Sequence, residues 1–167
     1  YDGTLVFPRS RDGALVLLGR KAKKVGAGRW NGYGGEIESN DPNPAAAAAR
    51  ELLEESGLSA DPAKLEKVAI IYFHNRLSTG EEYTNTTHVY FVSEFEGTPI
   101  GTPEMTDPTW FEIDKVPYGE MIPSDREWLG PILNGKHVIA EAWLSAFQRE
   151  SLQPVQIREA ASDELET

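Results

Sequence analysis

The sequence contains no cysteine among its 167 residues. This absence excludes a disulfide framework, a zinc site held by thiolates and a cysteine nucleophile. Long apolar runs are missing as well, since no uninterrupted stretch approaches the roughly 20 residues that a membrane helix needs. What remains is the chemistry of oxygen and nitrogen groups, so the acidic residues carry most of the information.

Basic residues are few: 16 lysines and arginines stand against 27 aspartates and glutamates, which gives a formal net charge of -11. Duplex nucleic acid is held through clustered lysine and arginine, so we expect neither duplex nucleic acid nor a membrane among the partners. The negative net charge does not exclude small phosphorylated ligands. A carboxylate cluster can bind such anions through divalent metal ions, which reverse the local charge of the site.

The composition that is present, 40% hydrophobic and 26% charged, is typical of a folded globular protein. No repeat or linker divides the chain, so we expect one domain over residues 1–160 and an acidic, flexible tail at 161–167. No basic segment followed by an apolar stretch opens the sequence. We therefore expect a cytoplasmic protein that is a monomer or a small homo-oligomer.

Short apolar runs separated by turn residues predict a β-sheet that starts early in the chain. Residues 4–7 and 14–21 flank the Asp12-Gly13 turn signal, which favours a hairpin. Further strands are expected at 67–77, 87–97, 107–114, 137–147 and 155–160, the last two as a closing pair.

Two helices are expected between these strands. Asn43 can cap the first, with Pro44 in its first turn and Gly57 as its stop after about Ser56. The second spans 124–135, with Ser124 as the candidate cap and an apolar stripe along one face. The sequence thus predicts an α+β domain with a mixed or antiparallel sheet and two main helices.

Three carboxylates share one face of the first helix. Glu51, Glu54 and Glu55 have the i, i+3, i+4 spacing of neighbours on a helix surface. Like charges so placed destabilise a helix by roughly a few tenths of a kcal/mol per pair. A divalent cation would compensate them, and magnesium takes oxygen ligands while leaving positions for water and substrate phosphates. An ordinary solvated face with Arg50 is the alternative.

The surrounding string resembles the Nudix box, G-x5-E-x7-R-E-U-x-E-E-x-G-U, where U is a bulky aliphatic residue. The second half matches at every specified position: Arg50, Glu51, Leu52, Glu54, Glu55, Gly57 and Leu58. In the first half, Asp41 stands in the place of the glutamate, and eight residues instead of seven separate it from the arginine. The glutamate of the family commonly pairs with that arginine. Asp41, Glu36 and Glu38 are the candidates for this role.

The resemblance implies a Nudix-type α/β/α sandwich that hydrolyses a nucleoside diphosphate linked to another group. By position, the ligands of Mg²⁺, with Mn²⁺ as a substitute, would be Glu51, Glu54, Glu55 and the carbonyl oxygen of Gly35. Arg50 would orient the carboxylates by ion pairing. The family often uses a further carboxylate outside the box as base or ligand. Glu104 is the candidate here, and a plain surface residue is the alternative.

The resemblance extends to the MutT-type branch that hydrolyses 8-oxo-dGTP and similar oxidised purine nucleoside triphosphates. It rests on GAGRWNGYGG (26–35), EFEGTP (94–99) and WFEIDKVPYGEM (110–121). It implies release of the monophosphate and pyrophosphate, which sanitises the nucleotide pool. The alternatives are another nucleoside diphosphate derivative (a nucleotide sugar, ADP-ribose or a dinucleotide) and a noncatalytic nucleotide-binding module.

Base-binding residues follow from the same branch. Asn31 and Asp125 match its base-reading asparagine and one of two adjacent aspartates, while Ser124 stands at the other. A buried polar group left unpaired costs roughly 1–3 kcal/mol, which is how such groups select a base. Ile122 replaces a stacking tryptophan. A turn-forming role for Asn31 and a helix-start role for Asp125 are the alternatives.

Phe73 falls at an aromatic position of the implied pocket, and Lys21 falls where a lysine approaches it. A core role for Phe73 and a solvated position for Lys21 are the alternatives. His74, His88 and His137 lack metal-ligand spacing and are expected to be strand residues with satisfied rings. The tryptophans are expected in the core.

Overall fold

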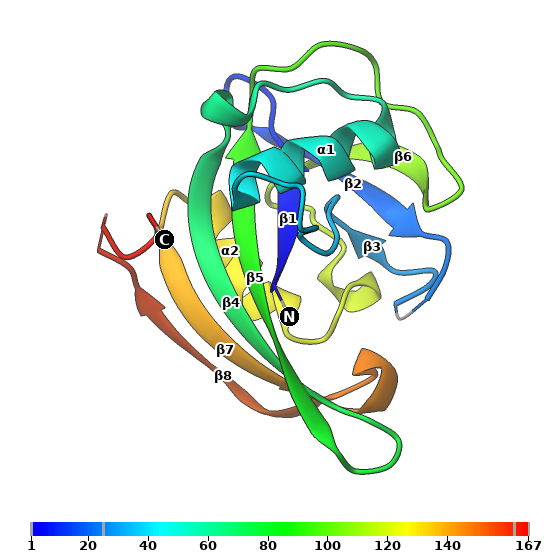
Figure 1. Ribbon diagram of the computed structural model, residues 1–167, viewed down its shortest axis with the longest axis vertical. Helices are drawn as coiled ribbons and strands as arrows, with labels where there is room; N and C mark the ends of the chain where they lie inside the picture. The colour runs from blue at the N-terminus through cyan, green and yellow to red at the C-terminus, as the bar shows by residue number, and fades with distance from the viewer. Residues whose placement is uncertain (1, 25, 162, 167) are drawn as a thin grey trace.

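The computed structural model describes residues 2–24, 26–161 and 163–166. Within these ranges the strands form a five-stranded sheet, ordered β1-β5-β4-β7-β8, and a three-stranded sheet, ordered β3-β2-β6 (Figure 1). The strands are β1 (Asp2–Pro8), β2 (Leu15–Lys21), β3 (Trp30–Asn31), β4 (Glu66–Arg76), β5 (Glu82–Val92), β6 (Met105–Glu112), β7 (Val138–Leu144) and β8 (Ser151–Glu159). The helices are α1 (Pro44–Ser56) and α2 (Asp125–Leu133), and the 3-10 turns are η1 (Pro62–Lys64), η2 (Tyr118–Glu120) and η3 (Ala146–Gln148).

The larger sheet is mixed. Its β1–β5 and β4–β7 pairs are parallel, and its β4–β5 and β7–β8 pairs are antiparallel. The helices lie on opposite faces, because α1 packs against the side of β1 that carries Val6, whereas α2 packs against the side that carries Phe7. The α+β sandwich with two main helices is therefore confirmed, as is the closing β7–β8 pair.

The expected hairpin between residues 4–7 and 14–21 was wrong. β1 pairs with β5, whereas β2 pairs with β3 and β6 in the other sheet. The Asp12-Gly13 turn does form, with Gly13 at a φ of 75° and the Asp12 carboxylate accepting from the amide of Ala14 at 3.0 Å. It carries the chain between sheets, because β1 is buried on both faces from Gly3 to Phe7 and needs cover that a two-stranded hairpin cannot give.

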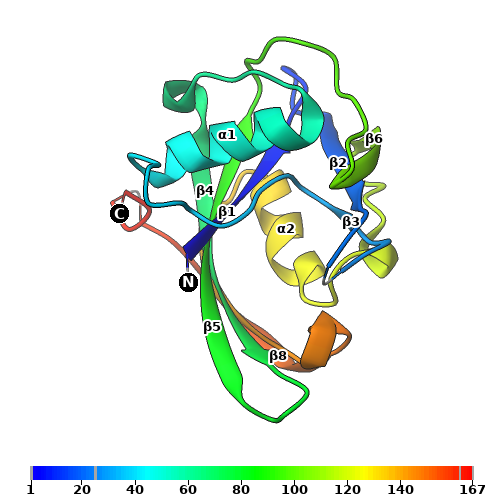
Figure 2. The same cartoon turned by 45° about the vertical axis from the view of Figure 1, so that its right-hand side comes forward.

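The other strand boundaries differ mainly at the β4–β5 hairpin. β5 begins at Glu82 and ends at Val92, five residues earlier at each end than the expected 87–97. Its first part pairs with the end of β4 in a long ribbon that projects from the body (Figures 1 and 2). Apolar patterning did not reveal this part, because the first residues of β5 carry polar groups and the first three are exposed.

The ends of α1 follow from its sequence. The Asn43 side chain accepts from the amide of Ala46 at 2.8 Å, and Pro44 occupies the first turn. At the other end Gly57 is left-handed, with a φ of 78°, and its amide donates to the carbonyl of Leu53. α2 differs, since Ser124 stands at the N-cap position but makes no capping hydrogen bond and its hydroxyl is buried without a partner.

Replacing Gly57 by alanine should destabilise the protein by about 1–2 kcal/mol, because a left-handed residue with a Cβ is strained. The added Cβ would also lie 3.1 Å from Cγ1 of Ile100. The matched control is Gly119→Ala, where nothing lies within 4 Å of an added Cβ and the backbone is not left-handed. Urea unfolding should separate the two variants, and an equal loss in both would contradict the prediction.

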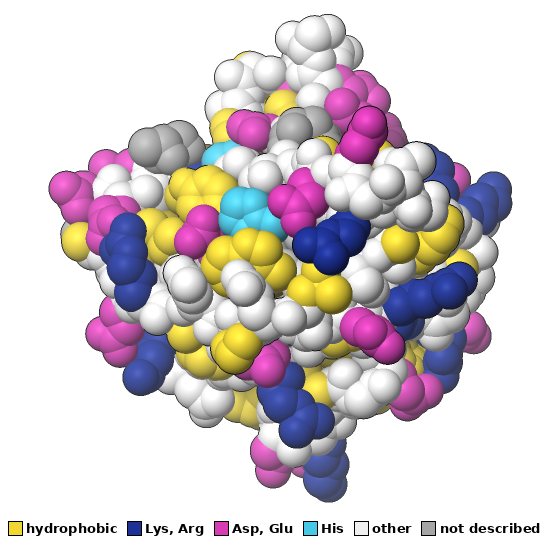
Figure 3. Space-filling model, turned by 90° about the horizontal axis from the view of Figure 1, so that it is seen from below, with side chains coloured by type: hydrophobic (Ala, Val, Ile, Leu, Met, Phe, Trp, Pro, Cys, Tyr) yellow, Lys and Arg dark blue, Asp and Glu magenta, His cyan; other side chains and the backbone are white. Residues whose placement is uncertain are grey.

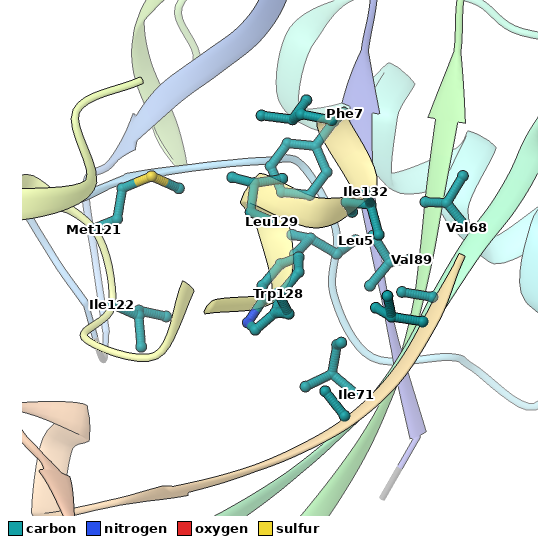
Figure 4. Close-up of a cluster of buried hydrophobic side chains, with 14 of the residues drawn as sticks. Leu5, Phe7, Val68, Ile71, Val89, Met121, Ile122, Trp128, Leu129 and Ile132 are labelled. Carbon is teal, nitrogen blue, oxygen red and sulfur yellow. The ribbon is translucent and has the colours of Figure 1, made fainter. Parts of the chain in front are cut away.

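The main core lies between the larger sheet and α2. Trp128 projects from α2 between Phe7 and Ile71, with its ring centroid 6.2 Å from that of Phe7 (Figure 4). Ile122, on the loop before α2, faces the same region. Trp128 also borders the cavity described below. It therefore lies in the core, as expected of the tryptophans, and in the wall of the cavity as well.

The histidines correct one expectation. The His74 ring contacts Thr84 and Glu141 and stacks on Trp143, so it is satisfied as expected. His88 is buried, but neither ring nitrogen has a hydrogen-bond partner, and its nearest carboxylate, Asp2, is 3.6 Å away. His137 precedes β7 instead of lying within it, but its ring is satisfied, because its Nε2 lies 3.0 Å from Oε1 of Glu66.

The expected domain and tail meet near Ala160, where β8 ends. In the tail, Glu164 accepts two hydrogen bonds from Arg158, at 3.0 and 2.7 Å, and Leu165 is buried. Tyr1 and Val25 of the expected domain, and Ser162 and Thr167 of the tail, lie outside the described residues. The flexibility of the tail and the domain boundary stay predictions.

Candidate active site

A cavity of about 590 Å³ is bordered by α1, by the start of α2 and by strands of both sheets. Its wall contains most of the site residues that the sequence indicated, which are Lys21, Asn31, Gly35, Glu51, Glu54, Glu55, Phe73, Glu104, Ile122 and Asp125. Arg50 does not border the cavity but contacts its carboxylates from α1.

Glu55 is partly buried, whereas Glu54 is exposed. Oε1 of Glu55 accepts a hydrogen bond from the amide of Gly34 at 2.8 Å. Burial raises the pKa of Glu55 to about 7, and Glu51 adds to the rise, while the Gly34 hydrogen bond and Lys21 oppose it. A carboxylate in this environment gains by meeting a cation or a proton.

Glu51 lies against the loop before α1. A Cβ on Gly35 would lie only 2.7 Å from Oε1 of Glu51, so glycine is needed for this close approach. Burial raises the pKa of Glu51, although Arg50 opposes the shift. The approach brings the Gly35 backbone and the Glu51 carboxylate to the same wall of the cavity.

Arg50 takes Asp41 as its partner. Its Nε and NH2 donate to the two Asp41 oxygens at 3.0 and 2.8 Å, which is a bidentate pair. Glu36 contributes only its carbonyl, at 3.3 Å, and the Glu38 carboxylate lies 3.8 Å from NH1. The hydrogen bond to Asp41 is the main reason that the pKa of Arg50 is raised.

A turn before α1 holds Asp41 in place. The amide of Asp41 donates to the carbonyl of Glu38 at 3.0 Å, and the amide of Glu38 donates to the Asp41 carboxylate at 2.8 Å. The shorter aspartate is thereby held where it meets the fork of Arg50. The departure from the box spacing does not break the pair.

The donor set fits a hard divalent cation in its chemistry, because it combines three carboxylates with a nearby backbone carbonyl. In the described part of the chain, however, no three acidic or histidine side chains converge as a metal-binding group. NH1 of Arg50 lies between two of them instead, 3.1 Å from Glu51 and 3.3 Å from Glu54. The guanidinium supplies the charge compensation in this geometry.

Replacing Arg50 by lysine should lower the melting temperature by roughly 2–4 °C. It should also lower the turnover. A lysine cannot form the fork to Asp41 or reach Glu51 and Glu54 at the same time. The control is Arg158→Lys, because Arg158 also makes a bidentate pair but is exposed. We expect no measurable change there. A melting temperature of Arg50→Lys equal to that of the wild type would contradict the prediction.

The other end of the cavity is apolar and aromatic around one buried acid. Asp125 is 1% exposed, and neither carboxyl oxygen has a hydrogen-bond partner. Burial raises the pKa of Asp125 to about 8, so the group is largely protonated at neutral pH. Phe73, Ile122 and Trp128 border the cavity beside it. Such a carboxyl is placed to bond a polar ligand edge.

The position of Asn31 is compatible with either of the roles that the sequence left open. Its Oδ1 accepts from the amide of Gly32 at 2.8 Å, as a turn former does, and the residue borders the cavity. Lys21 is not simply solvated, because it borders the cavity and burial lowers its pKa. Glu104 directly precedes β6, and its Oε1 lies 4.0 Å from Nζ of Lys23.

Sequence reasoning missed several residues of the wall. Lys23 and Lys24 follow Lys21 at the carboxylate end, and their clustering after a strand was a visible signal. Asn85 and Gln148 also border the cavity. Asn85 lies opposite Phe73 in the β4–β5 register, which could be found only once that pairing was known.

The fold and the site together define an enzyme with an α/β sandwich fold, in which carboxylates of α1 border a cavity of a size that suits a small ligand. The NUDIX domain family model matches residues 2–131, and the chain belongs to the Nudix family. The resemblance seen in the box is thus confirmed. Members of this family generally use divalent metal ions.

Two curated relatives carry the same description, oxidized purine nucleoside triphosphate hydrolase. The Danio rerio protein is 40% identical over 124 residues, 74% of this chain and 75% of the relative. The Mus musculus protein is 40% identical over 121 residues, 72% of this chain and 73% of the relative.

Among solved structures, the mutator MutT protein from Bacillus halodurans superposes with a TM-score of 0.76. The match covers 95% of this chain and 96% of that one at 20% sequence identity, so it supports the fold alone. Of the residues that the structure describes, no helix is long and apolar enough to cross a membrane.

Proposed function

We propose that this Nudix hydrolase cleaves an oxidised purine nucleoside triphosphate, 8-oxo-dGTP or a close analogue, to the monophosphate and pyrophosphate. One observation carries the proposal: a single cavity has the α1 carboxylates in its wall together with the buried, unpartnered carboxyl of Asp125. The first group suits a phosphate chain with its cations, and the second suits a base edge. The descriptions of the two 40% identical relatives support the same substrate class.

The proposed cation is Mg²⁺, with Mn²⁺ as a substitute, held by Glu51, Glu54, Glu55 and the Gly35 carbonyl. When bound, such an ion neutralises phosphate charge and lowers the pKa of a bound water. Glu104 is the proposed further carboxylate, placed at the same wall to accept a proton from water.

The basic side chains at the carboxylate end would hold the phosphates. Lys21, Lys23 and Lys24 border the cavity, and Lys21 interacts electrostatically with Glu55 and Glu104. Arg50, which contacts Glu51 and Glu54 without bordering the cavity, would keep these carboxylates oriented. At the far end, Asn31 and Asp125 would bond the base between Phe73 and Ile122.

A substrate panel tests this proposal. It compares 8-oxo-dGTP, 2-hydroxy-dATP, the unmodified dNTPs, ADP-ribose and diadenosine polyphosphates, each with Mg²⁺. We expect the highest kcat/KM for an oxidised purine triphosphate, with pyrophosphate as a product. A preference for ADP-ribose, a nucleotide sugar or a dinucleotide would replace this substrate. Failure to hydrolyse any member of the panel, measured by separating the nucleotide products, would favour a noncatalytic nucleotide-binding module.

The nucleotide is also the partner that we propose, without duplex nucleic acid or a membrane. On the face shown in Figure 3, acidic and basic side chains are interspersed instead of forming a continuous basic surface. That distribution supports a small ligand over duplex nucleic acid. A monomer or small homo-oligomer in the cytoplasm, where nucleotide pools are found, completes the proposal.

A further inference from the structure

The turn between β7 and β8 adds a side chain to the cavity. η3 lies at the end of the molecule away from α1 (Figures 1 and 2), yet its last residue, Gln148, borders the same cavity as the α1 carboxylates. Asn85 and Phe73, from the β4–β5 ribbon, border the cavity as well. Nothing in the Nudix box involves this turn.

The backbone of this turn is strained. Phe147 and Gln148 are consecutive non-glycine residues in the left-handed region, with φ of 58° and 55°. Each such residue costs on the order of 1 kcal/mol or more and persists only where its surroundings enforce it. Burial does not compensate Phe147, whose side chain is 58% exposed. In this conformation Gln148 reaches both Asn75 and the cavity.

Asn75 holds that side chain. Nε2 of Gln148 donates to Oδ1 of Asn75 at 2.9 Å, and Nδ2 of Asn75 donates to the carbonyl of Phe73 at 3.1 Å. Asn75 is 2% exposed, so its amide has little freedom to turn. With one N–H of Gln148 bonded to Asn75, the side-chain amide is held in one orientation and its Oε1 is available to accept a hydrogen bond from a ligand.

Asn85 offers a second acceptor. Its Oδ1 is buried and has no hydrogen-bond partner, and it lies beside the aromatic end of the cavity because Asn85 pairs with Phe73 across the two strands. An unpaired buried acceptor costs roughly 1–3 kcal/mol, which a ligand N–H would recover. The base end of the cavity therefore has two amide oxygens that favour a donor.

Oxidation of a purine supplies such a donor. N7 of an unmodified guanine is an acceptor, whereas the 8-oxo form carries a hydrogen on N7. We propose that Gln148 and Asn85 are specificity-determining residues whose amide oxygens share this N7–H in a bifurcated hydrogen bond, and that Asn75 positions Gln148. The inference rests on the proposed function and adds residues that would distinguish an oxidised from an unmodified purine.

The test measures kcat and KM of the wild type, Gln148→Ala and Asn85→Ala on three substrates. 8-Oxo-dGTP has the N7–H, dGTP lacks it, and 8-bromo-dGTP has a bulky C8 group without the N7–H. Each alanine variant should raise KM for 8-oxo-dGTP about tenfold, with kcat within twofold, and change KM for the other two less than twofold. The matched control is Gln156→Ala, an exposed glutamine on β8, which should change nothing.

Asn75→Ala should also raise KM for 8-oxo-dGTP without lowering kcat, and the Asn75→Ala/Gln148→Ala double variant should lose no more than Gln148→Ala. Calorimetric binding of 8-oxo-dGMP without metal should weaken in parallel, in variants whose melting curves remain cooperative.

The outcomes separate the two proposals. A wild type without preference for 8-oxo-dGTP would overturn the proposed function and this inference with it. A wild type with that preference, kept in full by Gln148→Ala and Asn85→Ala, would overturn this inference alone. Equal losses on 8-oxo-dGTP and dGTP would also overturn it, because they would show a general packing role.

Discussion

Glu55→Gln should reduce turnover by on the order of 10²-fold or more while the protein stays folded. The fold is expected to tolerate glutamine, because burial already raises the pKa of Glu55 to about 7 and so favours its neutral form. The amide of Gly34 can still donate to the retained oxygen. Steady-state kinetics with Mg²⁺ measures the loss. The control is Glu81→Gln, an exposed residue of the β4–β5 turn that should keep full activity.

The same substitution should change how the free energy of unfolding depends on pH. In the folded protein the pKa of Glu55 is raised from 4.5 to about 7, so its ionisation opposes folding. Without metal, the wild type should lose stability as the pH rises from about 5 to about 7, by up to about 3 kcal/mol from this group. Glu55→Gln should flatten that loss in urea unfolding. Full activity of Glu55→Gln, or an unchanged pH profile of stability, would contradict the assignment.

Asp125→Ala should reduce kcat/KM for an oxidised purine triphosphate by about 100-fold, mainly through KM. The removed carboxyl is buried and unpartnered, so a ligand polar group that it bonds would be left unpaired in the variant. Asp125→Asn keeps the shape and should lose less, about tenfold. Kinetics on 8-oxo-dGTP and dGTP measure both losses, and Asp114→Asn, in an exposed turn, is the control.

The pH dependence of stability tests the environment of the Asp125 carboxyl independently of the kinetics. The pKa of Asp125 is raised from 3.8 to about 8 by burial, so this group should make the wild type progressively less stable as the pH rises from about 4 to about 8, with no further loss beyond that range. Asp125→Asn cannot ionise and should gain stability relative to the wild type at pH 9. If the variant binds 8-oxo-dGTP as the wild type does, the base-reading role of Asp125 is wrong.

The local features of α1 could be predicted from the sequence. The cap at Asn43, the stop at Gly57 and the shared face of the three glutamates all depend on residues within one helix. The same holds for the position of Arg50 beside Glu51 and Glu54. Such short-range features follow directly from backbone geometry and side-chain spacing.

Long-range pairing could not be predicted in the same way. The Asp12-Gly13 signal indicated a turn correctly but not the sheet that each flanking strand joins, because β1 pairs with β5 some eighty residues later. The cavity residues Asn85 and Gln148 depend on the register of β4 with β5 and on the strained turn before β8. Neither leaves a periodic pattern in the sequence.

The pairing of Asp41 with Arg50 has a consequence for related sequences. An aspartate is one methylene shorter than the glutamate of the box, and one additional backbone residue lies between it and Arg50, yet the bidentate pair forms. Deleting that residue alone would move the short carboxylate away from the guanidinium, and lengthening the side chain alone would crowd it. We therefore expect the aspartate and the additional residue to occur together in related sequences.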